Sequence, residues 1–304
     1  MSNKKKQSWL LLLLALGLAL ALAACGGGND VDTAGDDDNG ASSAGEGTNY
    51  QIIGIEPGAG VMKATERAIE EYGLDDWTLV ESSSAAMGAE LTKAYENEEP
   101  IIVTGWTPHW KFAKFDLKYL EDPKGVYGEE EKIHTLVRKG LQDDEPNAYK
   151  LLDQFNWTGD DMAEVMVLIE EGAAPEDAAQ QWIDENSDKV DAWLEGVDTN
   201  NDGVISLAYV AWDSEIASTN VVAKVLESIG YQVELVQLDA APMFAAVAEG
   251  EVDGMVAAWL PYTHEDNYEE YGDDLEDLGE NLTGAKIGLV VPSYMDIDSI
   301  EDLK

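Results

Sequence analysis

Three tryptophans are the side chains whose types and positions most strongly indicate a binding site. Trp106 ends the apolar run IIVTGW, Trp212 ends ISLAYVAW, and Trp259 lies near the end of DGMVAAWLP. Aromatic rings that follow buried strands and gather in one cleft usually bind a ligand. A sugar could stack on such rings, but the sequence offers no dedicated set of amides and acids for its hydroxyl groups. We therefore favour a cation that the ring faces attract.

A quaternary ammonium group suits three indole rings because it has no N–H to donate and is attracted mainly by aromatic faces. Each ring contributes roughly 0.5–2 kcal/mol to such a contact, so three rings contribute roughly 2–6 kcal/mol. Micromolar binding needs about 8 kcal/mol. The remainder must come from another part of the ligand, and the carboxylate of a zwitterion is the natural source.

Two features of the sequence could hold that carboxylate. The turn Gly58 to Val61 leads into a helical pattern, and free N–H groups at a helix N-terminus attract a carboxylate or a phosphate. This turn lacks the Lys-Ser/Thr ending of a nucleotide phosphate loop. His264, five residues after Trp259, could supply a side-chain donor, although a histidine there could equally be a surface or core residue.

The elements that must position these residues recur in the same order in two halves of the chain. Each half alternates strands with helical patterns, and the predicted strands are 50–56, 77–83 and 101–106, then 205–212, 231–238 and 253–261. This order predicts an α/β fold with parallel-type sheets and helices on both faces. Such sheets bind ligands at the carboxyl ends of their strands, where the three tryptophans lie.

Further elements are expected between and after the two halves. We predict strands over 132–140 and 284–295 and helices over 161–172 and 175–196. Four other tryptophans are predicted to lie in the core: Trp77, Trp157, Trp182 and Trp193.

The N-terminal segment has the features of a lipoprotein signal peptide over residues 1–24. Three lysines precede a Leu- and Ala-rich run that ends just before Cys25, the only cysteine. The apolar run is too short for a comfortable membrane span, so we predict cleavage ahead of Cys25 and a lipid on its thiol. Residues 25–49, rich in Gly, Asp and Ser, are predicted to be a flexible linker between the lipid and the folded body.

The charge of the chain excludes some partners. Its 304 residues hold 18 Lys and Arg against 62 Asp and Glu, a net charge of −44. Such a surface repels nucleic acid and anionic lipid headgroups. The acids are spread along the whole chain, which is typical of a protein that works at high salt, where screening weakens self-repulsion.

Four motifs together resemble the glycine betaine-binding lipoproteins of osmoprotectant ABC importers. They are IGIEPGAGVM, IIVTGWTPHW, LAYVAWDSEIAST and AWLPYTH, in collinear order within residues 50–304. The resemblance implies a type II periplasmic-binding-protein fold, whose two lobes close on the ligand. It also implies the site residues: a prism of Trp106, Trp212 and Trp259 around a trimethylammonium group, and the backbone amides of Gly60 and Val61 with His264 on the carboxylate.

We expect lobe I at 50–108 plus about 284–304, and lobe II at about 109–283. The resemblance further implies a monomer without a cofactor, anchored by lipid at the outer face of the cell membrane, that delivers its ligand to an ABC permease. Another methylated onium compound, such as choline, carnitine, proline betaine or a dimethylsulfonium compound, is the alternative ligand class. A sensor or adhesion lipoprotein of the same fold also fits the sequence.

Catalysis and metal binding are the remaining possibilities. Asp213, Glu215 and His109 lie near the predicted cleft, but no serine elbow, cysteine nucleophile or spaced metal-ligand cluster accompanies them, so we predict no enzyme activity. The segment DTNNDGVIS matches the start of a calcium loop, although Tyr209 replaces the bidentate Glu. We expect a plain turn, with a secondary calcium candidate at Asp198, Asn200 and Asp202.

Overall fold

Parallel strands form the first half of the fold. In the computed structural model, which describes residues 41–304, β1 (Gln51–Ile53) lies between β2 (Thr78–Val80) and β3 (Val103–Thr107). β1 pairs in parallel with both neighbours. The predicted signal peptide, Cys25 and the first part of the linker lie outside the described residues.

Two helices connect these strands. α2 (Gly60–Tyr72) follows β1 and buries one face, which includes Val61 and Met62. α3 (Ser84–Glu96) follows β2 and begins after Ser83, whose side chain accepts a hydrogen bond from the N–H of Ala86 at 3.2 Å. Such N-caps satisfy one of the free N–H groups of the first turn, whereas the N-cap of α2 makes no side-chain bond.

The second half repeats this order. β6 (Val204–Tyr209) pairs in parallel with β7 (Gln232–Gln237) and with β8 (Gly254–Leu260). α10 (Asp213–Ser228) connects β6 to β7, and α11 (Ala240–Ala248) connects β7 to β8. The predicted α/β architecture with two similar halves is confirmed, and the strand ends that carry the tryptophans are those that the alternation indicated.

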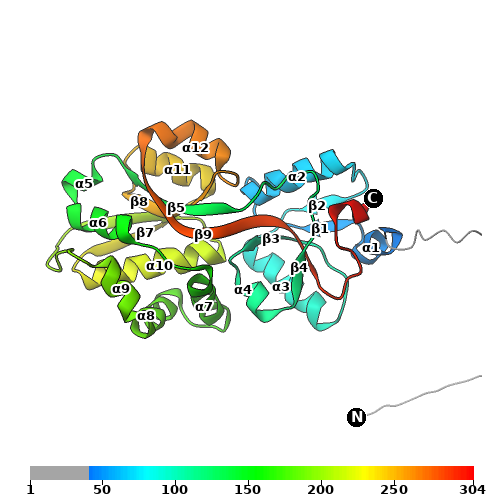
Figure 1. Cartoon of the computed structure of the whole chain (residues 1–304), viewed down its shortest axis with the longest axis horizontal. Helices are drawn as coiled ribbons and strands as arrows, with labels where there is room; N and C mark the ends of the chain where they lie inside the picture. Colours follow the sequence, from blue (N-terminus) through cyan, green and yellow to red (C-terminus); the bar gives the residue numbers. More distant parts are fainter. Residues whose placement is uncertain (1–40) are drawn as a thin grey trace, which may run out of the picture. The chain divides into compact units, whose positions relative to one another are not determined.

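One long antiparallel strand links the two halves. β9 (Leu275–Pro292), drawn in orange to red across the middle of Figure 1, pairs through its first part with β5 (Glu131–Arg138) and through its second part with β3. β5 also pairs antiparallel with β8. The strand order is therefore β2-β1-β3-β9-β5-β8-β6-β7. The first part of β9 was not predicted, because its acidic and glycine-rich sequence shows no run of apolar side chains.

A short segment after β3 also pairs with β9. α4 (Trp110–Lys114) is followed by β4 (Leu117–Tyr119), which is antiparallel to the last residues of β9, Val290 to Pro292. β4 lies beyond the predicted boundary at residue 108, yet its partner belongs to the segment predicted for lobe I. The described residues 41–304 belong to one compact unit, so the lobe boundaries stay a prediction.

A group of helices covers the second half beside α10. These helices are α5 (Leu141–Asp144), α6 (Pro146–Gln154), α7 (Gly159–Glu170), α8 (Pro175–Glu185) and α9 (Ser187–Trp193). The single helix predicted over 175–196 is wrong. The helical backbone is interrupted at Asn186, whose side-chain amide donates to the carbonyl oxygen of Trp182 at 3.0 Å.

The core tryptophans pack as predicted despite that break. The rings of Trp182 and Trp193 stack with centroids 5.8 Å apart, and the ring of Trp157 meets Trp182 edge-on at 5.7 Å. All three are buried, and so is Trp77, whose indole N–H donates to the carbonyl oxygen of Leu303 at 2.9 Å.

The end of the predicted linker is a helix. α1 (Ala41–Thr48) contacts β1 and the short C-terminal helix η2 (Ile300–Leu303). A Cβ at Gly45 would collide with the ring of Tyr50, so the glycine permits a contact that a larger residue would prevent. The prediction of flexible chain up to residue 49 is therefore wrong for this last part, because small residues that usually indicate a linker pack here.

The remaining described elements are α12 (Glu265–Tyr271) and the single turn η1 (Gly272–Asp274). Over the part of the chain that the structure describes, every helix is too short or too polar to cross a membrane.

Replacing Trp182 by Ala should lower the free energy of unfolding by about 3–5 kcal/mol, because it removes a fully buried ring that two other tryptophans contact. Urea denaturation followed by circular dichroism measures this loss. Trp182→Phe is the matched control and should lose less, since it keeps an aromatic ring in the same place. Equal stability of Trp182→Ala and the unchanged protein would contradict this packing role.

Candidate functional site

The three predicted tryptophans meet at one cavity between the two halves. Trp106 lies on β3, Trp212 precedes α10 and Trp259 lies on β8. Their exposed fractions are 4%, 7% and 3%. The cavity has a volume of about 20 Å³, which exceeds the roughly 10–15 Å³ that one water needs. The rings are thus buried with space left beside them.

Each of the three indole N–H groups donates to an acceptor on a neighbouring element. The partners are Ser214 Oγ for Trp106 at 3.2 Å, Glu56 Oε2 for Trp212 at 3.1 Å, and Glu215 Oε1 for Trp259 at 2.7 Å. These bonds use the polar edge of each ring and fix its orientation. The ring faces remain available to the cavity, which is the part of an indole that attracts a cation.

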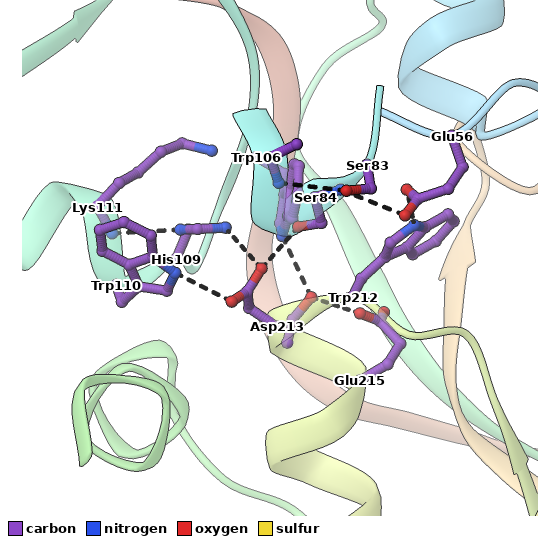
Figure 2. A network of polar contacts seen from close by, with 12 residues as sticks. Glu56, Ser83, Ser84, Trp106, His109, Trp110, Lys111, Trp212, Asp213 and Glu215 are labelled. Atoms are coloured by element: carbon purple, nitrogen blue, oxygen red, sulfur yellow. Dashed lines mark hydrogen bonds and ion pairs between the residues drawn. The ribbon is translucent and has the colours of Figure 1, made fainter. Parts of the chain in front are cut away.

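Several of these bonds cross from one half of the fold to the other. Glu56 follows β1 and also accepts from the backbone N–H of Ser84 at 3.2 Å, as Figure 2 shows, whereas Trp212 belongs to the second half. The hydroxyl of Ser84, on α3, donates to Oδ2 of Asp213, on α10, at 2.6 Å. The same contacts that orient the rings therefore hold the two halves against each other.

Asp213 is the centre of this polar network (Figure 2). Besides Ser84, it accepts from the indole N–H of Trp110 at 3.0 Å, and Nε2 of His109 lies 3.4 Å from its Oδ2. Burial alone would raise the pKa of Asp213, but His109, Ser84 and Trp110 together lower it below its usual range. Asp213 is thus an ionised acceptor.

His109 and Glu215, the two other groups that the sequence placed near the cleft, differ from Asp213 because burial shifts their pKa values toward the neutral form. Burial, with the charge of Lys111, lowers the pKa of His109 to about 4, so this ring is neutral at pH 7. Burial raises the pKa of Glu215 to about 7, although the hydroxyl of Ser214 and the indole of Trp259 donate to its carboxylate. All three candidates for acid–base chemistry are engaged in positioning tryptophans.

The N-terminus of α2 lines the same cavity through Gly60 and Val61. They are the first two residues of the helix, so their N–H groups have no acceptor within it. A Cβ at Gly60 would collide with the carbonyl oxygen of Thr263, which comes from the second half of the fold. Glycine is required here because the two backbones approach each other directly.

His264 contacts two of the cavity tryptophans as a neutral donor, and it is not itself among the residues that line the cavity. Its Nδ1 accepts the backbone N–H of Trp259 at 3.0 Å, so the proton of the neutral ring is on Nε2. That Nε2 is buried and has no hydrogen-bond partner among the described residues. Burial, with the charge of Lys63, lowers the pKa of His264 to about 3, and the ring stacks on Trp212 with centroids 6.1 Å apart.

The structure thus brings together all six residues that the sequence and the resemblance indicated: Trp106, Trp212, Trp259, Gly60, Val61 and His264. Their role in binding stays a prediction. Sequence reasoning missed Glu56 and Ser214 as acceptors for the indoles. An acid at the carboxyl end of β1, directly before the glycine turn, was the available signal for Glu56.

The secondary calcium candidate lies in the loop before β6. The N–H of Asp198 donates to the side chain of Asn147 at 3.1 Å, and the side-chain amide of Asn201 donates to the carbonyl oxygen of Asp198 at 2.7 Å. Hydrogen bonds within the protein therefore hold this turn. Within the described part of the chain, no group of three His, Cys, Asp or Glu residues could hold a metal ion. Calcium binding at Asp198, Asn200 and Asp202 stays untested.

Comparison with known proteins places this site in context. A family model described as the substrate binding domain of ABC-type glycine betaine transport system matches residues 28–185 and 203–304. The glycine betaine/carnitine transport binding protein GbuC of Listeria monocytogenes is 57% identical over 263 residues, which are 86% of this chain and 88% of that protein.

Two solved structures are also similar over part of their length. Lactococcal OpuAC, in a closed form complexed with glycine betaine, is 49% identical with a TM-score of 0.44, over 48% of this chain and 57% of that one. An ABC-transporter choline binding protein in complex with choline is 26% identical with a TM-score of 0.47, over 64% of each chain.

The ring of His264 should remain neutral, with its proton on Nε2, down to about pH 4, because burial disfavours the imidazolium. Nitrogen-15 NMR of the histidine side chains across pH 4–8 measures both the tautomer and the pKa. A His264→Gln variant identifies the resonance. Titration of this ring near its ordinary pKa of 6.5, or a proton on Nδ1, would contradict the arrangement.

Proposed function

We propose, because this chain belongs to the family of substrate binding domains of ABC-type glycine betaine transport systems, that it captures glycine betaine and delivers it to a membrane permease. One observation carries the proposal. Three indoles and the first two N–H groups of a helix line one cavity, and an unpartnered neutral histidine donor stacks on one of those indoles. Each end of a betaine zwitterion therefore has a chemically suitable partner there.

The ammonium end of the ligand binds between the faces of Trp106, Trp212 and Trp259. Cation–π contacts contribute roughly 0.5–2 kcal/mol per ring, with the larger values at rings that are removed from solvent, as these three are. Glu56 and Glu215 add negative charge at the N–H edges of Trp212 and Trp259. An indole whose N–H is bound to a carboxylate presents a more electron-rich face, so these acids strengthen the attraction without touching the ligand.

The carboxylate end binds the N–H groups of Gly60 and Val61 and Nε2–H of His264. The first turn of a helix carries partial positive charge, which favours an anion at that place. A neutral histidine is better suited than a charged one, because an imidazolium would repel the ammonium end of the same small ligand. The lowered pKa of His264 thus serves binding.

The protein holds its ligand without changing it. His109, Asp213 and Glu215 are the acid–base groups of the site, and their contacts with Trp106, Trp110, Ser214 and Trp259 leave them no access to the cavity. The chain acts as a monomer without a cofactor, tied to the outer face of the cell membrane by a lipid on Cys25. The signal-like residues 1–24 support this location, and the charge of −44 suits a saline medium.

A related onium compound is the alternative ligand class. The relative from Listeria monocytogenes is described as transporting carnitine as well as glycine betaine, and a similar structure holds choline. Carnitine, proline betaine and dimethylsulfonium acids have both an onium group and a carboxylate, so they would use both ends of the site. Choline has no carboxylate and would leave the helix N-terminus and His264 unpartnered, so we place it below glycine betaine.

Replacing Trp106, Trp212 or Trp259 by Ala should weaken glycine betaine binding at least tenfold, because each variant removes one face from the cation. Isothermal titration calorimetry measures the dissociation constant. Trp193→Ala, a buried tryptophan far from the cavity lining, is the matched control; its folded fraction should keep the affinity of the unchanged protein. The proposal fails if the three site variants bind betaine as tightly as that control.

Replacing His264 by Phe should weaken betaine by about 1.5–3 kcal/mol, roughly ten- to a hundredfold, because a hydrogen bond to a charged group is lost. Choline binding should change less than twofold, since choline has no carboxylate to accept that bond. Phe preserves a ring beside Trp212, and His264→Gln, which restores a donor, should recover part of the betaine affinity. Equal losses for both ligands would show that His264 supports the fold rather than the carboxylate.

A further inference from the structure

A second cation already lies on the ring of Trp106. Nζ of Lys111 is 4.2 Å from the centroid of that indole. Lys111 is fully buried, and its Nζ has no hydrogen-bond partner within residues 44–304. Trp106 lines the ligand cavity, whereas Lys111 is not among the lining residues. Trp106 thus contacts the lysine and also lines the cavity, and Figure 2 draws both side chains next to the polar network.

The surroundings of Lys111 contain little that would balance a positive charge. Gly105 of β3, which is apolar, lies near Cε of its side chain. On its own helix, His109 is neutral and Phe112 offers a second ring, with its centroid 5.8 Å from Nζ. Asp213 on α10 is the charged group that acts on this lysine from another element, and it is too distant for an ion pair.

We propose that Lys111 controls the affinity of the cation site, because its ammonium on one face of Trp106 competes with the ligand ammonium on the other face. One ring cannot attract two cations as strongly as one, since each withdraws the electron density that attracts the other, and the two charges also repel through the ring. This inference rests on the proposed capture of a betaine. It makes Lys111 a positioning residue that the ligand does not touch.

Both protonation states of Lys111 are accessible near neutral pH. Burial lowers the pKa of Lys111 to about 7, and the nearby Asp213 opposes this shift only in part. Below this pKa the lysine is charged and the ligand should bind weakly; above it the lysine is neutral and the ligand should bind tightly. By linkage, a tenfold weaker affinity of the protonated form means that the ligand lowers the lysine pKa by one unit.

A pH series of betaine dissociation constants tests the proposal. In the unchanged protein, affinity should rise about tenfold between pH 5.5 and 8.5. Lys111→Met keeps the length of the side chain without the charge, and it should bind tightly at every pH of the series. Lys114→Met, one turn further along and 5.4 Å from the ring of Trp110, is the control and should retain the pH dependence of the unchanged protein.

Glu215 must be distinguished because its pKa is also about 7 and its ionised form would attract the ligand in the same pH range. If Lys111→Met retained the full pH dependence and Glu215→Gln abolished it, the effect would belong to Glu215 and the proposal would be overturned. NMR of the lysine Cε and Nζ atoms gives a second measurement on the unchanged protein, with Lys111→Met used only to identify the resonance.

In that NMR titration, saturating betaine should lower the pKa of Lys111 by about one unit. An unchanged pKa in the presence of bound betaine would overturn this inference and leave the proposed function intact. If the protein bound no betaine at any pH, the proposed function and this inference would fail together. A thermal midpoint of Lys111→Met at pH 7 that equals or exceeds that of the unchanged protein establishes that the variant is folded, since it removes a buried unpaired amine.

Discussion

The rest of the site depends on the hydrogen bonds that the three indole N–H groups donate, because these bonds fix the orientation of the rings. A quaternary ammonium offers no donor, so only ring faces can hold it, and a ring face is useful only when its orientation is fixed. Glu56, Ser214 and Glu215 provide that fixation by accepting the three N–H groups. Buried carboxylates are costly unless they accept hydrogen bonds. Rings and acids therefore stabilise each other.

The same bonds couple the site to the closure of the fold. Trp106 and Glu56 belong to the first half, and their partners Ser214 and Trp212 belong to the start of α10. Separation of the halves would break the hydrogen bonds of Trp106 with Ser214 and of Trp212 with Glu56 at the same time. Contact of Gly60 with Thr263 brings the N-terminus of α2 to the same boundary between the halves. β9 runs through both halves as one strand and connects them across the same boundary.

The site residues that lie at the carboxyl ends of strands could be predicted from the sequence. Trp106, Trp212 and Trp259 follow apolar runs whose strand character is clear, and the repeat of strands and helices brings such ends together. His264 could be found because it follows Trp259 by five residues, and Gly60 because its turn follows the first predicted strand. Their partners were not found, because Glu56 and Trp212 are separated by 156 residues and no local pattern connects them.

Other features that the sequence did not predict also depend on contacts between distant parts of the chain. His109, Asp213 and Glu215 suggested acid–base chemistry by type, but their tertiary contacts make them supports for rings. Lys111 occurs in a short helix where a lysine usually reaches solvent, and only the structure shows that it is fully buried. The helix break at Asn186 depends on a side-chain bond that periodicity cannot indicate. Burial and long-range pairing, rather than residue type, decide these roles.

Charge is distributed unevenly between the surface of the protein and the candidate site. The chain carries a net charge of −44, yet the groups that would touch a betaine are ring faces, backbone N–H groups and a neutral imidazole. Surface charges are screened over about 8–10 Å at physiological ionic strength and over about 3 Å in molar salt. The three site tryptophans are buried, so contacts with their rings are screened less than contacts at the surface. A strongly acidic surface, whose self-repulsion salt weakens, is thus compatible with a binding site that depends little on salt.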